Sequence, residues 1–466
     1  MSEMKTKTVC VQGLGFVGSA MSVAIANAKN KQGECLFKVY GIDLPNQAGL
    51  DRINALNKGI FPFETTDQDL IQATSNLKKD GNFEATSDET VFQKADIVVV
   101  DINLDVYYDD NKKPYLNLSA FKNAINTLGK NIRQDTLVII ETTVPPGTCE
   151  KVVKPILEEN FKSRGLVPER IKIAHSYERV MPGDYYYNSI INYWRVFSGI
   201  NKVSRKECQD FLSSIINVKE YPLTELASTT ASETAKVLEN SYRAVNIAFM
   251  EEWGRYAEKV GVNMFEIVNA IRKRPTHSNM RQPGFGVGGY CLTKDPFFAK
   301  LASKDLFGFN GLDFPFCTQA VELNNKMPLV SLNKIKEIFG GTLKGKRILL
   351  LGVSYKQDVG DTRYSPSEIF AREAIKEGVE LTCFDPLIKY WAEMNMRLPE
   401  KIPAFKEYDA VVLTVRSAVF ETKQFTTDLA KTDILVFDTN NVLNEAQIAV
   451  LKNGKCRLSF IGRGDV

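Results

Sequence analysis

The residues with the clearest potential for chemistry lie in one short stretch, PGFGVGGYCLTKDP, from Pro283 to Pro296. Cys291 follows four glycines in this stretch, and Lys294 and Asp295 come three and four residues after it. Glycine has no Cβ, so such a backbone approaches a ligand closely, and a neighbouring cation favours the reactive thiolate. The stretch therefore indicates a nucleophilic thiol on a ligand-binding loop. An inert, buried cysteine in a glycine-rich turn is the alternative that the stretch alone leaves open.

The beginning of the chain carries the fingerprint of a dinucleotide-binding fold. The strand pattern KTVCVQG runs into GLGFVG, a helix of small and aliphatic residues follows, and a second strand pattern, FKVYGID, ends at Asp43, 25 residues after Gly18. In this context the first glycine makes the turn, the second admits the pyrophosphate and the third packs helix on strand, while the helix N-terminus favours phosphate. The predicted contacts of the turn are Gly13, Gly15, Phe16, Val17 and Gly18.

Asp43 is predicted to accept the hydroxyls of the cofactor's ribose. Leu44 and Pro45 follow it, so no Arg or Lys stands there to bind a 2′-phosphate. The sequence therefore favours NAD over NADP.

Two further strand patterns lead to the edge where doubly wound folds bind ligands. ADIVVVDI (95–102) and DTLVIIET (135–142) are typical of buried strands, and TVPPGT follows the second. Because proline cannot continue a central strand, the chain must turn there, and Thr148 is predicted to cap the next helix. Thr143 is either a ligand contact or an ordinary residue at a strand end. RIKIAHS predicts the last strand of this domain and brings Glu178 and Arg179 to the same edge.

Between Leu226 and Val260, apolar residues recur in steps of three and four, which predicts one amphipathic helix of about 50 Å. A helix of this length is expected to span between domains or to form an oligomer core. We interpret its apolar stripe as a packing surface; the stripe comprises Ala235, Leu238, Tyr242, Val245, Phe249, Trp253, Tyr256 and Val260. Glu233, Lys236 and Asn240 share another side of the helix, as a solvated face or as a buried polar cluster.

The last third of the chain repeats the strand–helix–strand pattern of the first. RILLLGVSY, SEIFAREAIKEG and VELTCFDP are followed by the strand patterns DAVVLTV and DILVFDT. Only Gly352 stands where the first unit has three glycines, so this second doubly wound unit should not hold a dinucleotide in the same manner. The turn after its first strand carries Lys356, Asp361 and Arg363 where a phosphate would sit; a charged surface loop is the alternative.

Composition excludes several classes of protein. With 59 Lys and Arg against 56 Asp and Glu, no basic face is expected to bind nucleic acid. No run of about eighteen apolar residues predicts a membrane span, and glycines interrupt the first apolar run too early for a signal peptide. The eight cysteines form no CxxC pair, and His175 and His277 lie far from any partner motif. A reduced, cytoplasmic protein without a metal site is expected.

In their order, these motifs resemble those of the nucleotide-sugar dehydrogenases, the UDP-glucose/GDP-mannose dehydrogenase family, whose members oxidise C6 of a nucleotide-linked sugar to the acid. The resemblance covers nearly the whole chain and rests on GLGFVG, ETTVPPGT, YERVMPGD, WRVFSG, SETAKVLENSYRAVNIAF, PGFGVGGYCLTKDP, GVSYKQDVGDTRYSP and IGRG. It implies an α/β fold of two Rossmann-like doubly wound domains joined by a long central helix and a small helical domain. It also implies a role in polysaccharide biosynthesis and a homodimer formed through the central helix.

The resemblance further implies three domains. An NAD-binding Rossmann domain is expected at 1–205, a central helical dimerisation domain with the cysteine loop at 206–328, and a C-terminal Rossmann-like UDP-sugar-binding domain at 329–466.

The mechanism implied by the resemblance is a four-electron oxidation in which two NAD act in turn. Cys291 would capture the aldehyde as a thiohemiacetal, whose oxidation yields a thioester. Lys236 and Asn240 would stabilise the alkoxide and the later oxyanion. The residues matching those that handle a water and its proton are Asp295, Glu178 and Thr143.

Further contacts come from the same resemblance. Lys294 and Arg363 match residues that approach the cofactor from outside the first domain, and Thr143 lies on the cofactor side within it. Arg274 or Arg272 is expected to serve the neighbouring subunit's site. The predicted substrate contacts are Glu178, Lys236, Asn240, Arg274, Gly286, Gly288 and Lys356.

Some segments depart from the family pattern. VDINLD replaces the usual Thr-Pro after the fourth strand, and Tyr177 stands where proline is usual. QPG, GVGG and DPFF resemble the N-acetylhexosamine enzymes, whereas YCLTKD and KQDVGDTR resemble the UDP-glucose enzymes. The substrate is therefore UDP-glucose or a UDP-N-acetylhexosamine.

Two other functions compete with this one. A one-step β-hydroxyacid dehydrogenase needs neither Cys291 nor the second Rossmann-like unit. A non-catalytic NAD-binding regulator needs none of the catalytic residue types.

Overall fold

The computed structural model describes residues 6–180 and 183–466, and the chain forms two compact units. Unit 1 comprises Met1–Glu239 and Phe297–Asp313, and unit 2 comprises Asn240–Pro296 and Phe314–Val466. Met181 and Pro182, within the predicted YERVMPGD motif, lie outside the described residues.

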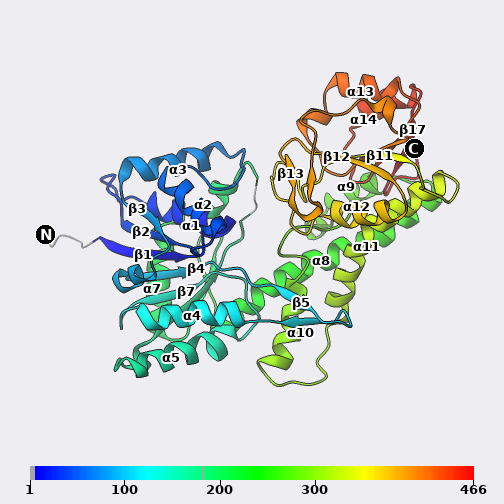
Figure 1. The fold of residues 1–466 in the computed structure, drawn as a ribbon. Coiled ribbons are helices and arrows are strands. Elements are labelled where there is room, and N and C mark those ends of the chain that lie inside the picture. Colours follow the sequence, from blue (N-terminus) through cyan, green and yellow to red (C-terminus); the bar gives the residue numbers. More distant parts are fainter. Residues whose placement is uncertain (1–5, 181–182) are drawn as a thin grey trace. The chain divides into compact units, whose positions relative to one another are not determined.

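Unit 1 is built on an eight-stranded sheet with the order β10-β9-β8-β7-β4-β1-β2-β3 (Figure 1). Neighbouring strands of this sheet are parallel, except for β8 and β9, which are antiparallel. The strands are β1 (Lys7–Gln12), β2 (Phe37–Ile42), β3 (Phe83–Thr86), β4 (Ile97–Val100), β7 (Leu137–Ile140), β8 (Lys172–Tyr177), β9 (Val196–Gly199) and β10 (Thr224–Glu225). Their apolar sequences suit a sheet that is covered on both faces.

Helices cover this sheet and bury its core. Side chains of α1, α3, α6 and α7 share one apolar cluster with β1 and β2, while α4 and α5 pack against each other. The helices are α1 (Phe16–Ala26), α2 (Gln47–Asn57), α3 (Gln68–Asp80), α4 (Ser119–Asn131), α5 (Lys154–Ser163), α6 (Tyr186–Ile191) and α7 (Lys202–Ser213).

Two features of unit 1 differ from the expectation. The segment RIKIAHS is not the last strand of the sheet, because β9 and β10 follow it and β9 pairs antiparallel with β8. In addition, a small hairpin of β5 (Val106–Tyr108) and β6 (Pro114–Leu116) occupies the segment after VDINLD.

The predicted long helix is confirmed as α8 (Thr229–Val260), a single helix of 32 residues that runs from unit 1 into unit 2. Most members of its apolar stripe, which we interpreted as a packing surface, are not buried within the single chain. Leu238 is 65% exposed and Tyr256 57%, and Tyr242, Phe249, Trp253 and Val260 are also exposed. By contrast Glu233, Lys236 and Asn240 are buried, so the polar side of α8 is not a solvated face.

Unit 2 contains the predicted second doubly wound fold. Its parallel five-stranded sheet has the order β12-β11-β15-β16-β17, with α11 and α12 on one face and α13 and α14 on the other (Figure 1). The strands are β11 (Arg347–Leu351), β12 (Glu380–Phe384), β15 (Ala410–Leu413), β16 (Leu435–Asp438) and β17 (Arg457–Phe460), with a small hairpin of β13 (Tyr390–Trp391) and β14 (Met396–Arg397). The helices are α9 (Met264–Arg272), α10 (Asp295–Asp305), which continues into unit 1, α11 (Pro315–Ile338), α12 (Pro366–Lys376), α13 (Lys423–Ala430) and α14 (Glu445–Lys452).

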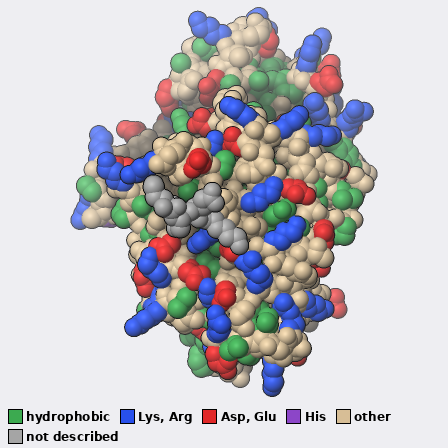
Figure 2. All heavy atoms as spheres, turned by 90° about the vertical axis from the view of Figure 1, so that its left-hand side faces the viewer, with side chains coloured by type: hydrophobic (Ala, Val, Ile, Leu, Met, Phe, Trp, Pro, Cys, Tyr) green, Lys and Arg blue, Asp and Glu red, His purple; other side chains and the backbone are tan. Residues whose placement is uncertain are grey.

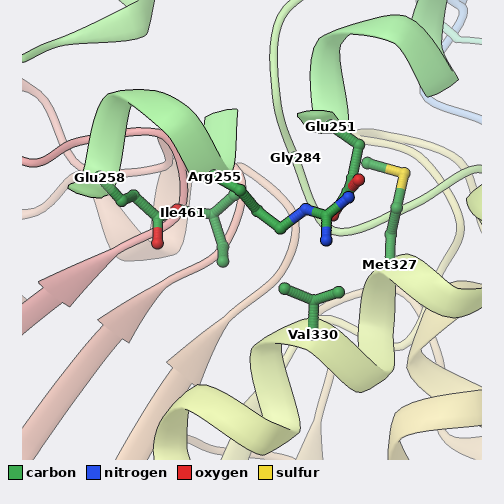
Figure 3. Close-up of a pocket in the computed structure, with 7 residues that line it drawn as sticks. All are labelled: Glu251, Arg255, Glu258, Gly284, Met327, Val330 and Ile461. Atoms are coloured by element: carbon green, nitrogen blue, oxygen red, sulfur yellow. The ribbon is translucent and has the colours of Figure 1, made fainter. Parts of the chain in front are cut away.

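The C-terminal IGRG segment is anchored to the end of α8. Gly462 N–H donates to a Glu258 carboxylate oxygen at 2.6 Å, and Lys334 Nζ lies 2.7 Å from the same carboxyl group. Figure 3 shows Glu258 and Ile461 on neighbouring elements beside a small cavity of about 10 Å³. That space holds about one water molecule, so this cavity is too small for a nucleotide.

The surface drawn in Figure 2 carries side chains of both signs, interspersed over the face. Within the described residues, no helix is long and apolar enough to cross a membrane.

Candidate active site

The GLGFVG turn in unit 1 has the geometry that a pyrophosphate requires. Gly13 has a φ of 97°, and a Cβ there would lie 2.5 Å from the carbonyl oxygen of Asp101. A Cβ on Gly18 would collide with Gly13 O at 1.9 Å, whereas one on Gly15 would meet nothing closer than 3.9 Å. The second glycine thus faces open space, and the other two are required by the fold.

The N-terminus of α1 also fits a phosphate. The helix begins at Phe16, and its N-cap residue Gly15 has no side chain to accept the first N–H groups. These N–H groups, including that of Val17, carry the positive end of the helix dipole. Phe16 stacks on Phe63, with ring centroids 4.4 Å apart, which fixes the turn. The residues present therefore fit a dinucleotide.

Asp43 lies at the tip of β2 but has a partner that sequence reasoning missed. Its carboxylate accepts from Leu44 N–H at 2.8 Å and Leu14 N–H at 3.3 Å, and Arg52 Nε lies 2.7 Å from Oδ2. Leu44 and Pro45 follow Asp43 as the sequence shows, but α2 returns Arg52 to its carboxylate from further along the chain. The i+9 spacing gave no sequence signal.

A second group of predicted residues meets at the carboxyl ends of β7 and β8. Lys236 Nζ donates to Glu178 O at 2.7 Å and lies 3.4 Å from its carboxylate, and both residues are buried. His175 lies within β8, and burial, with the Lys236 charge, lowers its pKa to about 3. This histidine is therefore neutral, and its Nδ1 pairs with Ser232.

The turn that carries Thr143 is held by Glu233 of α8. The Glu233 carboxylate accepts from Gly147 N–H at 2.5 Å and from Cys149 N–H at 2.8 Å. Thr148 is the N-cap residue of the helix that begins as a π-turn at Cys149, as predicted, but its side chain makes no capping bond, because its hydroxyl donates to Pro145 O. Burial raises the pKa of Glu233 to about 7, although both N–H donors favour its ionised form.

In unit 2, Cys291 is half-buried at the start of a turn that leads into α10. Asp295 N–H donates to Cys291 O at 2.9 Å, which fixes the position of the fully buried Asp295. The Asp295 carboxylate then accepts from Asn240 Nδ2 at 2.7 Å and pairs with Lys294 Nζ at 2.8 Å. Three predicted residues thus form one buried network beside the thiol.

The glycines before Cys291 let Tyr355 pack closely against the loop, in the space that a Cβ would occupy. A Cβ on Gly288 would lie 2.5 Å from Tyr355 Cβ, and one on Gly289 would lie 2.8 Å from the Tyr355 ring. Tyr355, which sequence reasoning did not select, lies near Cys291; burial, Asp361 and Cys291 raise its pKa. These glycines are needed first because the loop packs tightly on the turn after β11.

That turn also places the predicted Arg363. Its guanidinium pairs with Asp361, at 2.7 Å for Nη2, and lies over the Tyr290 ring, with Cζ 5.7 Å from its centroid. Lys294 Nζ lies 4.4 Å from the centroid of the same ring. Both Lys294 and Arg363, which the resemblance predicted to contact the cofactor, therefore make cation–π contacts with the Tyr290 ring.

Arg243 lies close enough to two other cations, Lys356 and Arg281, for its charge to act on both. Burial lowers the pKa of Lys356, and the charge of Arg243 adds to the effect. Burial likewise lowers the pKa of Arg281, with the charges of Arg243 and Arg272. Cations that destabilise one another in this way favour an anion. Arg243 and Arg281 are functional candidates that the sequence had not singled out, whereas the predicted Arg274 is exposed, directly before the 3-10 turn Pro275–His277.

The predicted residues thus fall into three groups, each brought together within one unit. Unit 1 holds the GLGFVG turn with Asp43, and separately Glu178 with Lys236; unit 2 holds Cys291, Lys294, Asp295 and Asn240. In residues 6–180 and 183–466, no cluster of three or more His, Cys, Asp and Glu side chains is arranged to hold a metal ion.

Known proteins identify the family. Residues 7–215 match the NAD binding domain of the UDP-glucose/GDP-mannose dehydrogenase family, residues 230–326 its central domain and residues 349–445 its UDP binding domain. The chain belongs to this family. It is thus an NAD-dependent nucleotide-sugar dehydrogenase with a domain for UDP, as the resemblance predicted.

Individual relatives of the family align over nearly the whole chain. The UDP-N-acetyl-D-mannosamine dehydrogenase of Methanocaldococcus jannaschii is 30% identical, covering 96% of this chain and 97% of the relative. The enzyme of the same name from Campylobacter jejuni is 28% identical over 88% of this chain and 96% of its own. The crystal structure of an NDP-N-acetyl-D-galactosaminuronic acid dehydrogenase from Methanosarcina mazei has a TM-score of 0.77 and 27% identity, covering 99% and 96% of the two chains.

Proposed function

We propose that this protein oxidises the C6 alcohol of a UDP-N-acetylhexosamine, of the N-acetylmannosamine type, to the uronic acid. Overall, alcohol, two NAD⁺ and water give carboxylate, two NADH and three protons. The buried network of Asn240, Lys294 and Asp295 beside Cys291 carries this proposal, because a one-step dehydrogenase has no use for a positioned thiol. The acetamido sugar is favoured by the names of the relatives that align over the full length.

The covalent steps assign a role to each group near the thiol. NAD, held by the GLGFVG turn, would supply the hydride acceptor for each oxidation at C6. The Cys291 sulfur adds to the aldehyde carbon, and the resulting thiohemiacetal loses a hydride to become a thioester. Water then breaks the carbon–sulfur bond and releases the acid. Asp295, oriented by Asn240, is proposed to move the protons of these steps.

Oxyanion stabilisation is proposed for Lys236 and Asn240, which lie one helical turn apart on α8. Glu178 and Thr143 are proposed to position the hydrolytic water. The pair of Lys236 with Glu178 supports this role, since it holds a buried cation and a carboxylate in fixed positions.

The UDP part of the substrate is proposed to bind in unit 2. Its diphosphate needs positive charge, and Lys356, Arg243 and Arg281 are proposed to supply it, since burial and then the charge of Arg243 lower the pKa of both Lys356 and Arg281. The backbone at Gly286 and Gly288 is proposed to contact the sugar, Lys294 and Arg363 the cofactor, and Arg274 the site of a neighbouring subunit. The domain limits at 205 and 328 and the cytoplasmic location stay predictions.

A homodimer is proposed to form through α8. Its exposed stripe includes three aromatic residues, and the ring of Trp253 makes edge contacts with those of Phe249 and Tyr256. An apolar surface of this kind on one helix is typical of a protein–protein contact.

A substrate panel tests the proposed sugar. Initial rates with NAD are measured for UDP-N-acetylmannosamine, UDP-N-acetylglucosamine, UDP-glucose and GDP-mannose. We expect the highest kcat/KM for UDP-N-acetylmannosamine, by at least about tenfold, which corresponds to about 1.4 kcal/mol. A preference for UDP-glucose would contradict the proposed sugar while leaving the reaction type intact.

A further inference from the structure

Four charged side chains line one edge of the sheet in unit 1. Val100 of β4 pairs with Ile140 of β7, so Asp101 and Glu141 come next to each other where these strands end. Tyr177 of β8 pairs with Val196 of β9, which brings Glu178 beside Arg195. Three carboxyl groups, those of Asp101, Glu141 and Glu178, therefore lie along this edge together with the buried guanidinium of Arg195.

The positive charges of this row are already engaged. Arg195 Nη1 bonds to the Glu141 carboxylate, and both residues are at most 3% exposed. Glu178 is held by Lys236 and by the N–H of Val180 at 2.7 Å. Among the described residues, Asp101 Oδ2 and Glu141 Oε2 are buried without a partner that donates to them.

The side chains of Asp101 and Glu141 lie close enough to hydrogen-bond. If both were ionised, neither carboxylate could donate a proton, and the two charges would repel each other. One shared proton resolves the conflict, as in other carboxyl pairs. Burial, then the charges of Glu141 and Glu178, raises the pKa of Asp101 well above its ordinary value. The other titratable groups around the pair are Cys208 of α7, close to Glu141 and Arg195, and the neutral His175 of β8.

Asp101 lies directly behind the turn that holds the cofactor. A Cβ on Gly13 would meet Asp101 O at 2.5 Å, and one on Gly18 would meet Asp101 Cβ at 3.0 Å. An ionised carboxylate in this buried position would repel the anionic pyrophosphate, and the low local dielectric would strengthen the repulsion.

We propose that the proton shared by Asp101 and Glu141 belongs to the cofactor site. It keeps the floor of the GLGFVG turn neutral, so that NAD binds tightly while the pair is protonated and weakly once both carboxyls are ionised. Asp101 is thus a positioning residue that acts on the cofactor through the turn. Asp101 belongs to VDINLD, the segment that departs from the family's usual Thr-Pro.

The test measures NAD binding by calorimetry between about pH 6 and pH 10 for the full-length wild type and for Asp101→Asn. We expect the wild-type Kd to rise at least tenfold toward alkaline pH, whereas Asp101→Asn retains the neutral-pH Kd across the range. Asp135→Asn, which changes a surface aspartate paired with Arg170, is the control and should follow the wild type. An alkaline weakening of the same size in Asp101→Asn would overturn the proposal.

Infrared spectroscopy tests the proton itself and needs no variant at that position. Wild type should show the absorption of a protonated carboxyl group that disappears over the pH range in which NAD affinity falls. In Glu141→Gln, Asp101 becomes the partner of Arg195 and ionises, so the band should be absent at neutral pH. A band that persists in Glu141→Gln, or that titrates independently of NAD affinity, would contradict a shared proton.

Discussion

At the tip of β2, the Asp43 carboxylate binds two backbone N–H groups and the guanidinium of Arg52. We propose that this pair of residues sets the preference for NAD over NADP. The carboxylate repels the 2′-phosphate of NADP, and the same carboxylate keeps Arg52 from binding that phosphate. Removal of the Asp43 charge should therefore favour NADP in two ways, by ending the repulsion of its 2′-phosphate and by releasing Arg52 to bind it.

We predict that Asp43→Asn raises the ratio of kcat/KM for NADP to that for NAD by at least about tenfold, or about 1.4 kcal/mol. Arg52 would be released to bind the 2′-phosphate. Initial rates with both cofactors measure the ratio.

The double variant Asp43→Asn with Arg52→Ala is the matched control. It should show a smaller gain, because the released cation is absent. An equal ratio in wild type and Asp43→Asn would remove Asp43 from cofactor selection.

The limits of sequence reasoning are clearest at this scale. Asp43 could be selected because the spacing from GLGFVG is short and fixed by one strand–helix–strand unit. Arg52 could not, because its approach depends on how α2 is oriented after a nonregular turn. Tyr355 was missed for a similar reason: it contacts Gly288 and Gly289 across about 65 residues of sequence.

At the scale of elements, Glu233 joins α8 to the turn before α5. Its carboxylate accepts the N–H groups of Gly147 and Cys149, which would otherwise lack partners at a buried helix start. Burial raises its pKa from 4.5 to about 7. The folded state therefore binds the proton more tightly than the unfolded state.

The sign of the pH effect follows from this difference. The contribution of Glu233 to the free energy of unfolding is fully present below about pH 4.5 and is lost as pH rises through about 7, by about 3 kcal/mol in total. Glu233→Gln resembles the protonated side chain, so its stability should change less over this range.

Urea unfolding of wild type and Glu233→Gln between about pH 5 and pH 8 measures this prediction. Glu233→Ala is the comparison that removes both acceptors and should destabilise at every pH, by about 2–4 kcal/mol. Parallel pH curves for wild type and Glu233→Gln would show that Glu233 does not titrate in this range.

The elements that could be predicted are those whose residue pattern is set by neighbours in the sequence. GLGFVG, the strands around it and the periodicity of α8 depend on neighbours in sequence, and the structure confirms them. β9 and β10, with four and two residues, pair only because distant segments return to the sheet. Thr148 had the right residue type for a cap, but the acceptor came from Glu233, about 85 residues away.

At the scale of the whole molecule, the exposed stripe of α8 is expected to be covered by a second copy of the chain. The pattern predicted the helix correctly, yet periodicity alone cannot distinguish a stripe buried within one chain from a stripe buried between two. Trp253 and Tyr256, with rings 5.7 Å apart, lie in the middle of its exposed part.

We predict that Trp253→Glu with Tyr256→Glu shifts the protein from dimer to monomer in sedimentation velocity, because two buried charges per chain would oppose each other in a symmetric contact. Tyr390→Glu, at an equally exposed aromatic of β13, should leave the dimer intact. A dimer that survives the double substitution would place the contact elsewhere.

A two-stage oxidation through Cys291 requires two NADH for each UDP-sugar consumed, and this ratio can be measured. With limiting UDP-N-acetylmannosamine and excess NAD, the wild type should form two NADH and one uronic acid per substrate. Cys291→Ser should bind NAD normally yet lose acid formation by at least about a thousandfold. One NADH per substrate in the wild type, or two at the full rate in Cys291→Ser, would contradict the account.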